Sequence, residues 1–159
     1  MDGLIKLAEE AGVCLQRQKR CLSLAESCTG GWISQAVTSI PGSSQWFDRG
    51  FVTYSNQAKE DMLGVSTETL LRYGAVSEET VTEMLNGLLQ HSLADVVVAV
   101  SGVAGPSGGS VDKPVGTVVV GCMCRSGIAN IRRYQFSGDR QAIRYQTVEK
   151  ALLGVINAI

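Results

Sequence analysis

The sequence has little of what marks several large classes of protein. It contains one histidine, His91, and its five cysteines form no Cys-x-x-Cys pair. A disulfide framework or a structural zinc site therefore has no support, and we expect no metal. No apolar run reaches the roughly 18 residues that cross a membrane. Basic side chains form no run interleaved with aromatic residues, so neither a membrane nor a nucleic acid is expected as a partner.

Length and charge are those of one compact domain. The chain has 159 residues, of which 45% are hydrophobic and 18% charged, with 14 basic against 15 acidic side chains. We therefore expect a single domain over residues 1–159. The first 18 residues carry three acidic side chains and lack the layout of a secretory signal peptide, which predicts a cytoplasmic protein.

Helical and strand patterns alternate along the chain. Helices are expected over residues 3–18, 32–40, 56–63 and 139–159, with two more capped by Ser66 and Ser77. Strands are expected over residues 22–25, 50–55, 95–100, 116–124 and 129–136, the last two antiparallel. This alternation predicts an α/β fold, a three-layer α/β/α sandwich with a mixed, mostly parallel sheet.

Hydroxyl-bearing residues follow three of the expected strands. They are Ser27, the pair Tyr54-Ser55 and the pair Ser101-Gly102. In open α/β sheets, ligands bind beyond the carboxyl ends of the strands. The first of these ends, residues 25–31, reads Ala-Glu-Ser-Cys-Thr-Gly-Gly, whose glycines allow a tight turn with exposed N–H groups. The turn either presents Ser27 as a nucleophile or is simply a capped helix start.

A nucleophilic serine needs a base, and the sequence offers few. His91 lies near the end of an expected helix, where a structural role is favoured. Lys59, in a desolvated pocket, could act as the base, with Tyr54 relaying the proton. The alternative is a solvated Lys59 on a helix surface and a Tyr54 that fills an edge strand. Cys28 is a rival nucleophile, because a helix N-terminus stabilises a thiolate.

Six short blocks occur in order along the chain. They are Ala25–Gly31, Tyr54-Ser55-Asn56-x-x-Lys59, Gly74–Ser77, Ser101-Gly102-x-Ala104-Gly105-Pro106, Lys113–Thr117 and Phe136-x-Gly138-Asp139-Arg140. Together they resemble the CinA C-terminal domain family over about residues 3–158. The stand-alone members of that family include amidases of nicotinamide mononucleotide. The resemblance implies hydrolysis of the carboxamide of this nucleotide, with no cofactor, and a homodimer or higher oligomer.

The resemblance also implies roles for particular residues. The catalytic set falls on Ser27, Tyr54 and Lys59. Oxyanion or substrate contacts fall on the turn Thr29, Gly30 and Gly31. Further substrate contacts fall on Ser101, Gly102 and Arg140.

Two questions stay open in the sequence. The substrate phosphate could be held by Arg140, or by the glycine-rich loop 105–110 with Lys113. Asp139 is expected to start a helix rather than to act in catalysis. The activity itself has two alternatives: a non-catalytic nucleotide-binding or regulatory module, and a serine-lysine amidase that acts on another small amide.

Overall fold

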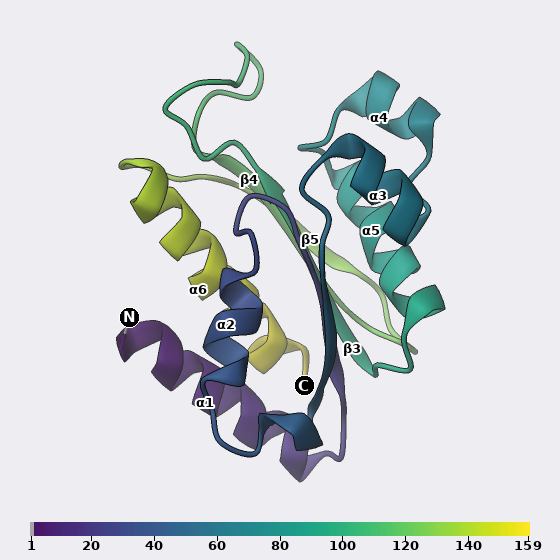
Figure 1. The fold of residues 1–159 in the computed structure, drawn as a ribbon, viewed down its shortest axis with the longest axis vertical. Coiled ribbons are helices and arrows are strands. Elements are labelled where there is room, and N and C mark those ends of the chain that lie inside the picture. Colours follow the sequence, from purple (N-terminus) through teal and green to yellow (C-terminus); the bar gives the residue numbers. More distant parts are fainter. Residues whose placement is uncertain (1) are drawn as a thin grey trace.

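One five-stranded sheet lies between two groups of helices (Figure 1). The computed structural model describes residues 2–159. The strands are β1 Leu22–Glu26, β2 Phe47–Val52, β3 Val96–Gly102, β4 Thr117–Cys124 and β5 Asn130–Gln135, in the spatial order β2-β1-β3-β4-β5. β1 pairs in parallel with β2 and β3, while β4 is antiparallel to β3 and to β5. Only β4 runs against the others, which confirms the predicted mixed, mostly parallel sheet.

The helices form the two outer layers of the predicted sandwich. One layer holds α1 Asp2–Arg17, α2 Trp32–Thr38 and α6 Arg140–Ala158; the other holds α3 Asn56–Leu63, α4 Thr67–Tyr73 and α5 Glu78–His91 (Figure 1). A short 3₁₀ turn, η1 Ser43–Gln45, precedes β2. β3 supplies valines to both hydrophobic cores, because its side chains alternate between two covered faces.

Most helices and strands begin and end close to the residues expected from local sequence signals. Ser66, Ser77 and Asp139 each cap a helix, accepting the N–H groups of Thr69, Thr80 and Ala142. The antiparallel pairing of β4 and β5 is also confirmed.

The second strand is the clearest boundary error. It was expected over residues 50–55 but spans Phe47–Val52. Its parallel register sets Val52 against Glu26. Beyond that pair the Thr53 N–H donates to the Glu26 carbonyl, and the chain turns so that Ser55 caps α3. Tyr54 therefore lies in the turn after the strand.

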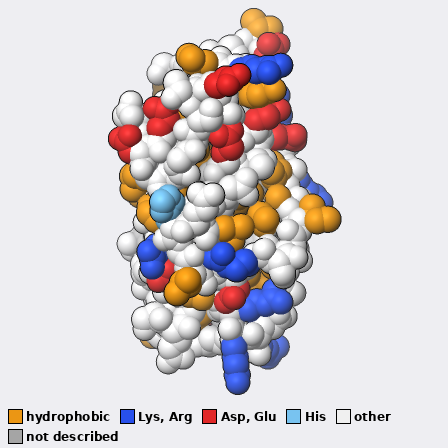
Figure 2. All heavy atoms as spheres, turned by 90° about the vertical axis from the view of Figure 1, so that its right-hand side faces the viewer, with side chains coloured by type: hydrophobic (Ala, Val, Ile, Leu, Met, Phe, Trp, Pro, Cys, Tyr) orange, Lys and Arg blue, Asp and Glu red, His pale blue; other side chains and the backbone are white. Residues whose placement is uncertain are grey.

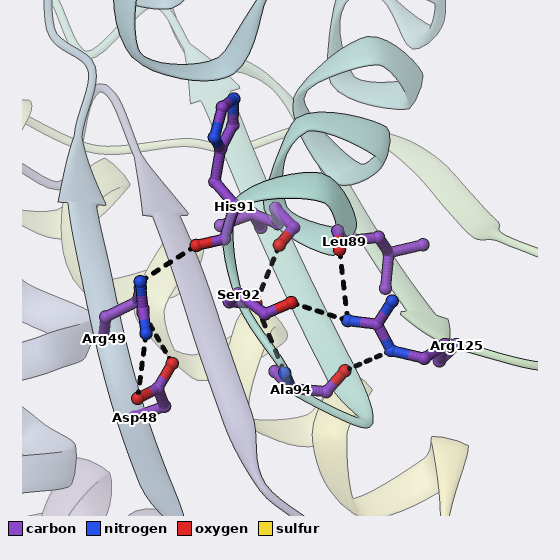
Figure 3. A network of polar contacts seen from close by, with 8 residues as sticks. Asp48, Arg49, Leu89, His91, Ser92, Ala94 and Arg125 are labelled. Carbon is purple, nitrogen blue, oxygen red and sulfur yellow. Dashed lines mark hydrogen bonds and ion pairs between the residues drawn. The ribbon is translucent and has the colours of Figure 1, made fainter.

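Two arginines hold the end of α5 (Figure 3). Arg125, just after β4, donates to the carbonyls of Leu89, Ser92 and Ala94. Arg49 on β2 donates to the His91 carbonyl and pairs with Asp48 at 2.6 Å. The His91 ring points away from this network in Figure 3. His91 lies near the amino end of β3. The length of that strand, on the order of 20 Å, therefore separates it from the carboxyl ends of the strands.

The face that carries α3, α4 and α5 is charged in patches (Figure 2). Acidic side chains gather mainly over its upper half and Lys and Arg side chains over its lower half, with apolar groups between them. This face therefore has no continuous basic stripe. Within residues 2–159, no helix is both long and apolar enough to cross a membrane.

Candidate active site

The carboxyl ends of three neighbouring strands meet at a small cleft. β1 lies between β2 and β3, so the three hydroxyl-bearing strand ends of the sequence come together. The cleft encloses about 250 Å³. Six residues predicted for the site line it: Ser27, Tyr54, Lys59, Ser101, Gly102 and Arg140. The other lining residues are Cys28, Asn56, Ala75, Val76, Val103, Ala104, Gly105 and Ser107.

Ser27 and Lys59 are in direct contact at the base of the cleft. Ser27 follows β1, and Lys59 lies in the first half of α3. The Lys59 Nζ lies 3.1 Å from the Ser27 Oγ. It also donates to two backbone carbonyls, that of Thr53 at 3.0 Å and that of Tyr54 at 3.3 Å. A neutral amine has two hydrogens and one lone pair. The carbonyls can hold both hydrogens, which leaves the lone pair for the Ser27 hydroxyl.

The surroundings of Lys59 favour its neutral form. Only 1% of the residue is exposed, so a solvated helix lysine is excluded. Burial lowers the pKa of Lys59, because the charged amine loses its hydration. The one ion pair within residues 2–159 joins Asp48 to Arg49, so no carboxylate compensates the charge of Lys59 there.

Tyr54 lines the cleft, and its phenol contacts Arg140 instead of Lys59. The residue is 59% exposed, and its hydroxyl accepts a hydrogen bond from Arg140 at 3.2 Å. Its backbone carbonyl, not its phenol, contacts Lys59. Arg140 also donates to the Gly105 carbonyl at 2.7 Å. Arg140 therefore joins Tyr54 to the β3–β4 loop at the cleft. A proton relay through the Tyr54 phenol stays a prediction.

Glu26 organises the turn that follows Ser27. Its carboxylate is fully buried and accepts five hydrogen bonds. Oε2 accepts from the Thr29 hydroxyl at 2.6 Å and from the N–H groups of Gly31 and Ile33; Oε1 accepts from the N–H and the hydroxyl of Ser34. An internal side chain thus caps the start of α2 and compensates its own burial. A lone acid at the end of an apolar strand was the signal for this role in the sequence.

These contacts change the role expected of residues 29–31. The Thr29 hydroxyl and the Gly31 N–H are bound to Glu26, and the Gly30 N–H donates to the Ser27 carbonyl at 3.0 Å. None of the three residues lines the cleft. They do not contact the substrate space with these groups; they shape the turn instead. Gly30 and Gly31 have φ values of 59° and 101°, which side chains other than glycine rarely allow.

Cys28 is not an activated nucleophile. Burial raises the pKa of its thiol to about 11, and the nearby Glu26 carboxylate adds to the increase. The N–H groups of Gly31 and Ile33, at the start of α2, are bound by Glu26. The thiol therefore stays protonated near neutral pH.

The basic residues around the cleft differ in their availability. Lys113 donates to the Tyr73 carbonyl and does not line the cleft. Of the glycine-rich loop 105–110, only Gly105 and Ser107 line the cleft. Arg140 also borders a second hollow of about 570 Å³ beside the cleft. Arg144 lines that hollow as well.

Sequence reasoning missed Arg144. It donates to the Cys28 carbonyl at 3.1 Å and to the Thr29 carbonyl at 2.9 Å. The spacing of four residues from Arg140 on one helix face was the only signal for it. Within the part of the chain that the structure describes, no group of three or more His, Cys, Asp or Glu side chains could hold a metal ion.

Comparison with known proteins gives consistent matches over nearly the whole chain. The sequence model of the CinA C-terminal domain matches residues 4–159. A nicotinamide-nucleotide amidohydrolase from Enterobacter agglomerans is 55% identical over 90% of this chain and 87% of its own length. One from Pseudomonas putida is 49% identical over 98% and 97%. The crystal structure of a competence/damage inducible protein from Agrobacterium tumefaciens matches with a TM-score of 0.95 and 46% identity, covering 98% of this chain and 94% of that one.

Proposed function

This chain belongs to the CinA C-terminal domain family, and from that premise we propose that it hydrolyses nicotinamide mononucleotide to nicotinate mononucleotide and ammonia. The relatives named as nicotinamide-nucleotide amidohydrolases support the substrate. The observation that carries the reaction is the 3.1 Å contact between the Ser27 hydroxyl and the buried Lys59 amine in the cleft.

The first half of the proposed reaction forms an ester on Ser27. The Ser27 Oγ bonds to the carboxamide carbon while its proton passes to the Lys59 Nζ, and the carbonyl electron pair moves onto the oxygen. When the tetrahedral intermediate collapses, the carbonyl forms again and the C–N bond breaks. The proton on Lys59 goes to the departing nitrogen, which leaves as ammonia.

The second half regenerates the enzyme. Lys59, neutral again, takes a proton from a water molecule that adds to the ester carbon. Collapse of this second intermediate returns the proton to the Ser27 Oγ and releases nicotinate mononucleotide. The lowered pKa of Lys59 suits both halves, because only the neutral amine can accept the proton.

Arg140 is the proposed ligand of the substrate phosphate. Its guanidinium lies between the cleft and the neighbouring hollow and now binds two neutral acceptors, the Tyr54 hydroxyl and the Gly105 carbonyl. A phosphate is a stronger acceptor and matches the forked geometry of the guanidinium. In this proposal Tyr54 acts through its carbonyl on Lys59 and through its exposed ring beside the substrate, while Ser101 and Gly102 form the wall of the cleft.

Ammonia release from the purified protein tests the proposal. Nicotinamide mononucleotide is the substrate, with nicotinamide and glutamine as control amides and Ser27→Ala as the control variant. We expect ammonia from the nucleotide alone and none with Ser27→Ala. Faster release from a control amide would make the protein an amidase of another substrate. Binding of the nucleotide without turnover would favour a regulatory module.

A further inference from the structure

The strand end that carries Ser101 lies directly beside the one that carries Ser27. β1 and β3 pair in parallel up to the two residues that precede these serines. The strand ends stay together beyond that pair, because a Cβ placed on Gly102 would lie 3.2 Å from the Cys28 Sγ. Both serines line the cleft. Neighbouring strands lie about 4.8 Å apart, a span that one covalent bond and one hydrogen bond can bridge.

Both serine side chains belong to the face of the sheet that α3 covers. Side chains along a strand alternate between the two faces. Ala25 and Ala99, two residues before the serines, pack in the core that α3, α4 and α5 cover. The 3.1 Å contact between the Lys59 Nζ and the Ser27 Oγ agrees with this direction, because Lys59 comes from α3. Ser101 therefore points to the same side of the sheet as Ser27 and Lys59.

The Ser101 hydroxyl is enclosed but has no partner. Only 1% of the residue is exposed, and among residues 2–159 no group forms a hydrogen bond with its Oγ. The fully buried hydroxyls without a partner there are those of Ser23 and Thr53. The Ser101 Oγ therefore keeps some accessible surface, and the cleft is the surface that Ser101 lines. Enclosed polar groups are normally hydrogen-bonded, so this hydroxyl is available to a group that enters the cleft.

The position of Lys59 determines which substrate atom faces Ser101. Lys59 is bound to the carbonyls of Thr53 and Tyr54, which follow β2, and β2 and β3 flank β1 on opposite sides. Ser27 thus lies between Lys59 on one side and Ser101 on the other. The departing nitrogen takes its proton from Lys59, so it must lie on the β2 side. The carbonyl oxygen on the same carbon then points toward β3.

We infer that the Ser101 hydroxyl donates a hydrogen bond to the oxyanion formed when Ser27 attacks the carboxamide. The inference rests on the proposed function. As the Ser27 Oγ bonds to carbon, its proton goes to Lys59 and the carbonyl electron pair moves onto the oxygen, which accepts the Ser101 O–H. Collapse restores the carbonyl and breaks the C–N bond, and the nitrogen leaves with the proton from Lys59. A donor fixed in place before the reaction stabilises such a charge without reorganisation.

Ser101 has one rival role, which is to hold the uncharged carboxamide before the reaction. The two roles differ in kinetics. A group that binds ground state and transition state alike affects KM when it is removed. A donor to the oxyanion acts mainly on the charge that develops in the transition state, so its removal lowers kcat.

The matched variants are Ser101→Ala and Ser23→Ala, each of which removes one unpartnered hydroxyl from a strand. Ser23 is fully buried on β1 and does not line the cleft. For Ser101→Ala we expect kcat for nicotinamide mononucleotide to fall about 10²- to 10³-fold, as for loss of one oxyanion donor, with KM nearly unchanged. Ser23→Ala should keep both constants, and Ser101→Thr, which keeps the hydroxyl, should keep most of kcat. An unchanged kcat in Ser101→Ala, or a raised KM at normal kcat, would overturn the inference.

A second measurement separates this role from a structural one. The Ser101 hydroxyl has no partner in the chain, so Ser101→Ala should not lower the thermal midpoint. Pyridine-3-boronic acid forms a tetrahedral adduct with a nucleophilic serine and so imitates the intermediate. Its affinity for Ser101→Ala should fall by about the same factor as kcat, while the affinity for nicotinate mononucleotide stays close to that of the wild type. A lowered midpoint, or equal loss of both affinities, would contradict a role limited to the oxyanion.

The inference can be tested even if nicotinamide mononucleotide is not the substrate. A phosphonofluoridate reacts with a nucleophilic serine, forming an O–P bond while fluoride leaves, and its phosphoryl oxygen gains charge in the same step. Intact mass spectrometry follows this labelling, with Ser27→Ala as the blank. We expect Ser101→Ala to be labelled much more slowly than the wild type and Ser23→Ala at the wild-type rate. Equal rates for Ser101→Ala and the wild type would refute the role of Ser101 alone. No labelling of wild-type Ser27 would refute the nucleophile and the oxyanion donor together.

Discussion

The Lys59 amine lies 3.1 Å from the Ser27 hydroxyl oxygen, although 32 residues separate them in the sequence. The parallel pairing of β1 and β2 and the tight turn into α3 bring the two together. Lys59 is buried against two carbonyls and has no carboxylate partner within residues 2–159. This environment favours the neutral amine, as the base role proposed for Lys59 requires, and the first two predictions depend on it.

Removal of Ser27 and of Lys59 should not be additive. Each of the changes Ser27→Ala and Lys59→Ala should lower kcat at least about 10³-fold, because the two groups carry out one proton transfer. In the double variant, kcat should be close to that of the slower single variant. Single-turnover ammonia release measures this. Losses that multiply in the double variant would show that the two residues act independently.

Activity should rise with pH through a lowered lysine pKa. The neutral form of Lys59 is the active one, and burial lowers the pKa of Lys59. The rising limb of kcat/KM should therefore lie well below the unperturbed lysine value of about 10.4. Lys59→Arg, which stays protonated, should be inactive across the whole range. A rise centred near pH 10 would contradict a buried, neutral Lys59.

Cys28 should be dispensable for the reaction. With its thiol pKa raised to about 11, only about one molecule in 10⁴ is a thiolate at pH 7. Cys28→Ala should keep most of the activity, and iodoacetamide should modify this position very slowly. Peptide mass mapping after alkylation, together with the ammonia assay, checks both expectations. A Cys28→Ala variant that folds but has no activity would support a cysteine nucleophile instead.

Arg140 and Lys113 should differ sharply in their effect on substrate affinity. Loss of one charge-assisted contact costs about 1.5–3 kcal/mol, so Arg140→Ala should raise KM at least tenfold with a modest change in kcat. Lys113→Ala is the control, because this amine is bound to the Tyr73 carbonyl and Lys113 does not line the cleft. Its KM should match that of the wild type. A raised KM in Lys113→Ala with an unchanged KM in Arg140→Ala would assign phosphate binding to the glycine-rich loop.

Glu26→Gln should destabilise the protein. Five donors converge on the Glu26 carboxylate, and a glutamine would place an NH₂ group against some of them. We expect the free energy of unfolding to fall by about 3 kcal/mol, within the range for breaking buried charged interactions. Urea denaturation measures this. Glu83→Gln is the control, because that carboxylate accepts from a single N–H, that of Ser66, at 2.9 Å; an equal loss there would contradict a special role for Glu26.

The parts of the fold that depend on local chemistry were predictable from the sequence. Ser66, Ser77 and Asp139 cap helices because a short polar side chain satisfies the N–H groups beside it. The cleft was predictable because hydroxyl groups followed three strands, and parallel strands bring such ends to one edge. Lys59 entered the candidate site by the same logic.

The features that were missed depend on contacts between distant segments. The register of β2 follows from its pairing with β1, and no local signal fixed it. Arg144 reaches a carbonyl 116 residues away, so its role could not be read from its own neighbourhood. The direction of the Tyr54 phenol depends on Arg140, from the last helix. The cytoplasmic location and the homo-oligomeric state expected from the sequence stay predictions.

The strand order has a consequence for how the site comes into being. β1 is made early in the chain but lies between β2 and β3, and the cleft is completed by Arg140 from the last helix. No contiguous fragment contains a working site, because each wall comes from a different third of the chain. We therefore expect the cleft to form together with the sheet itself. Enzyme activity should disappear together with global unfolding, and a nascent chain should stay inert until its C-terminal helix has docked.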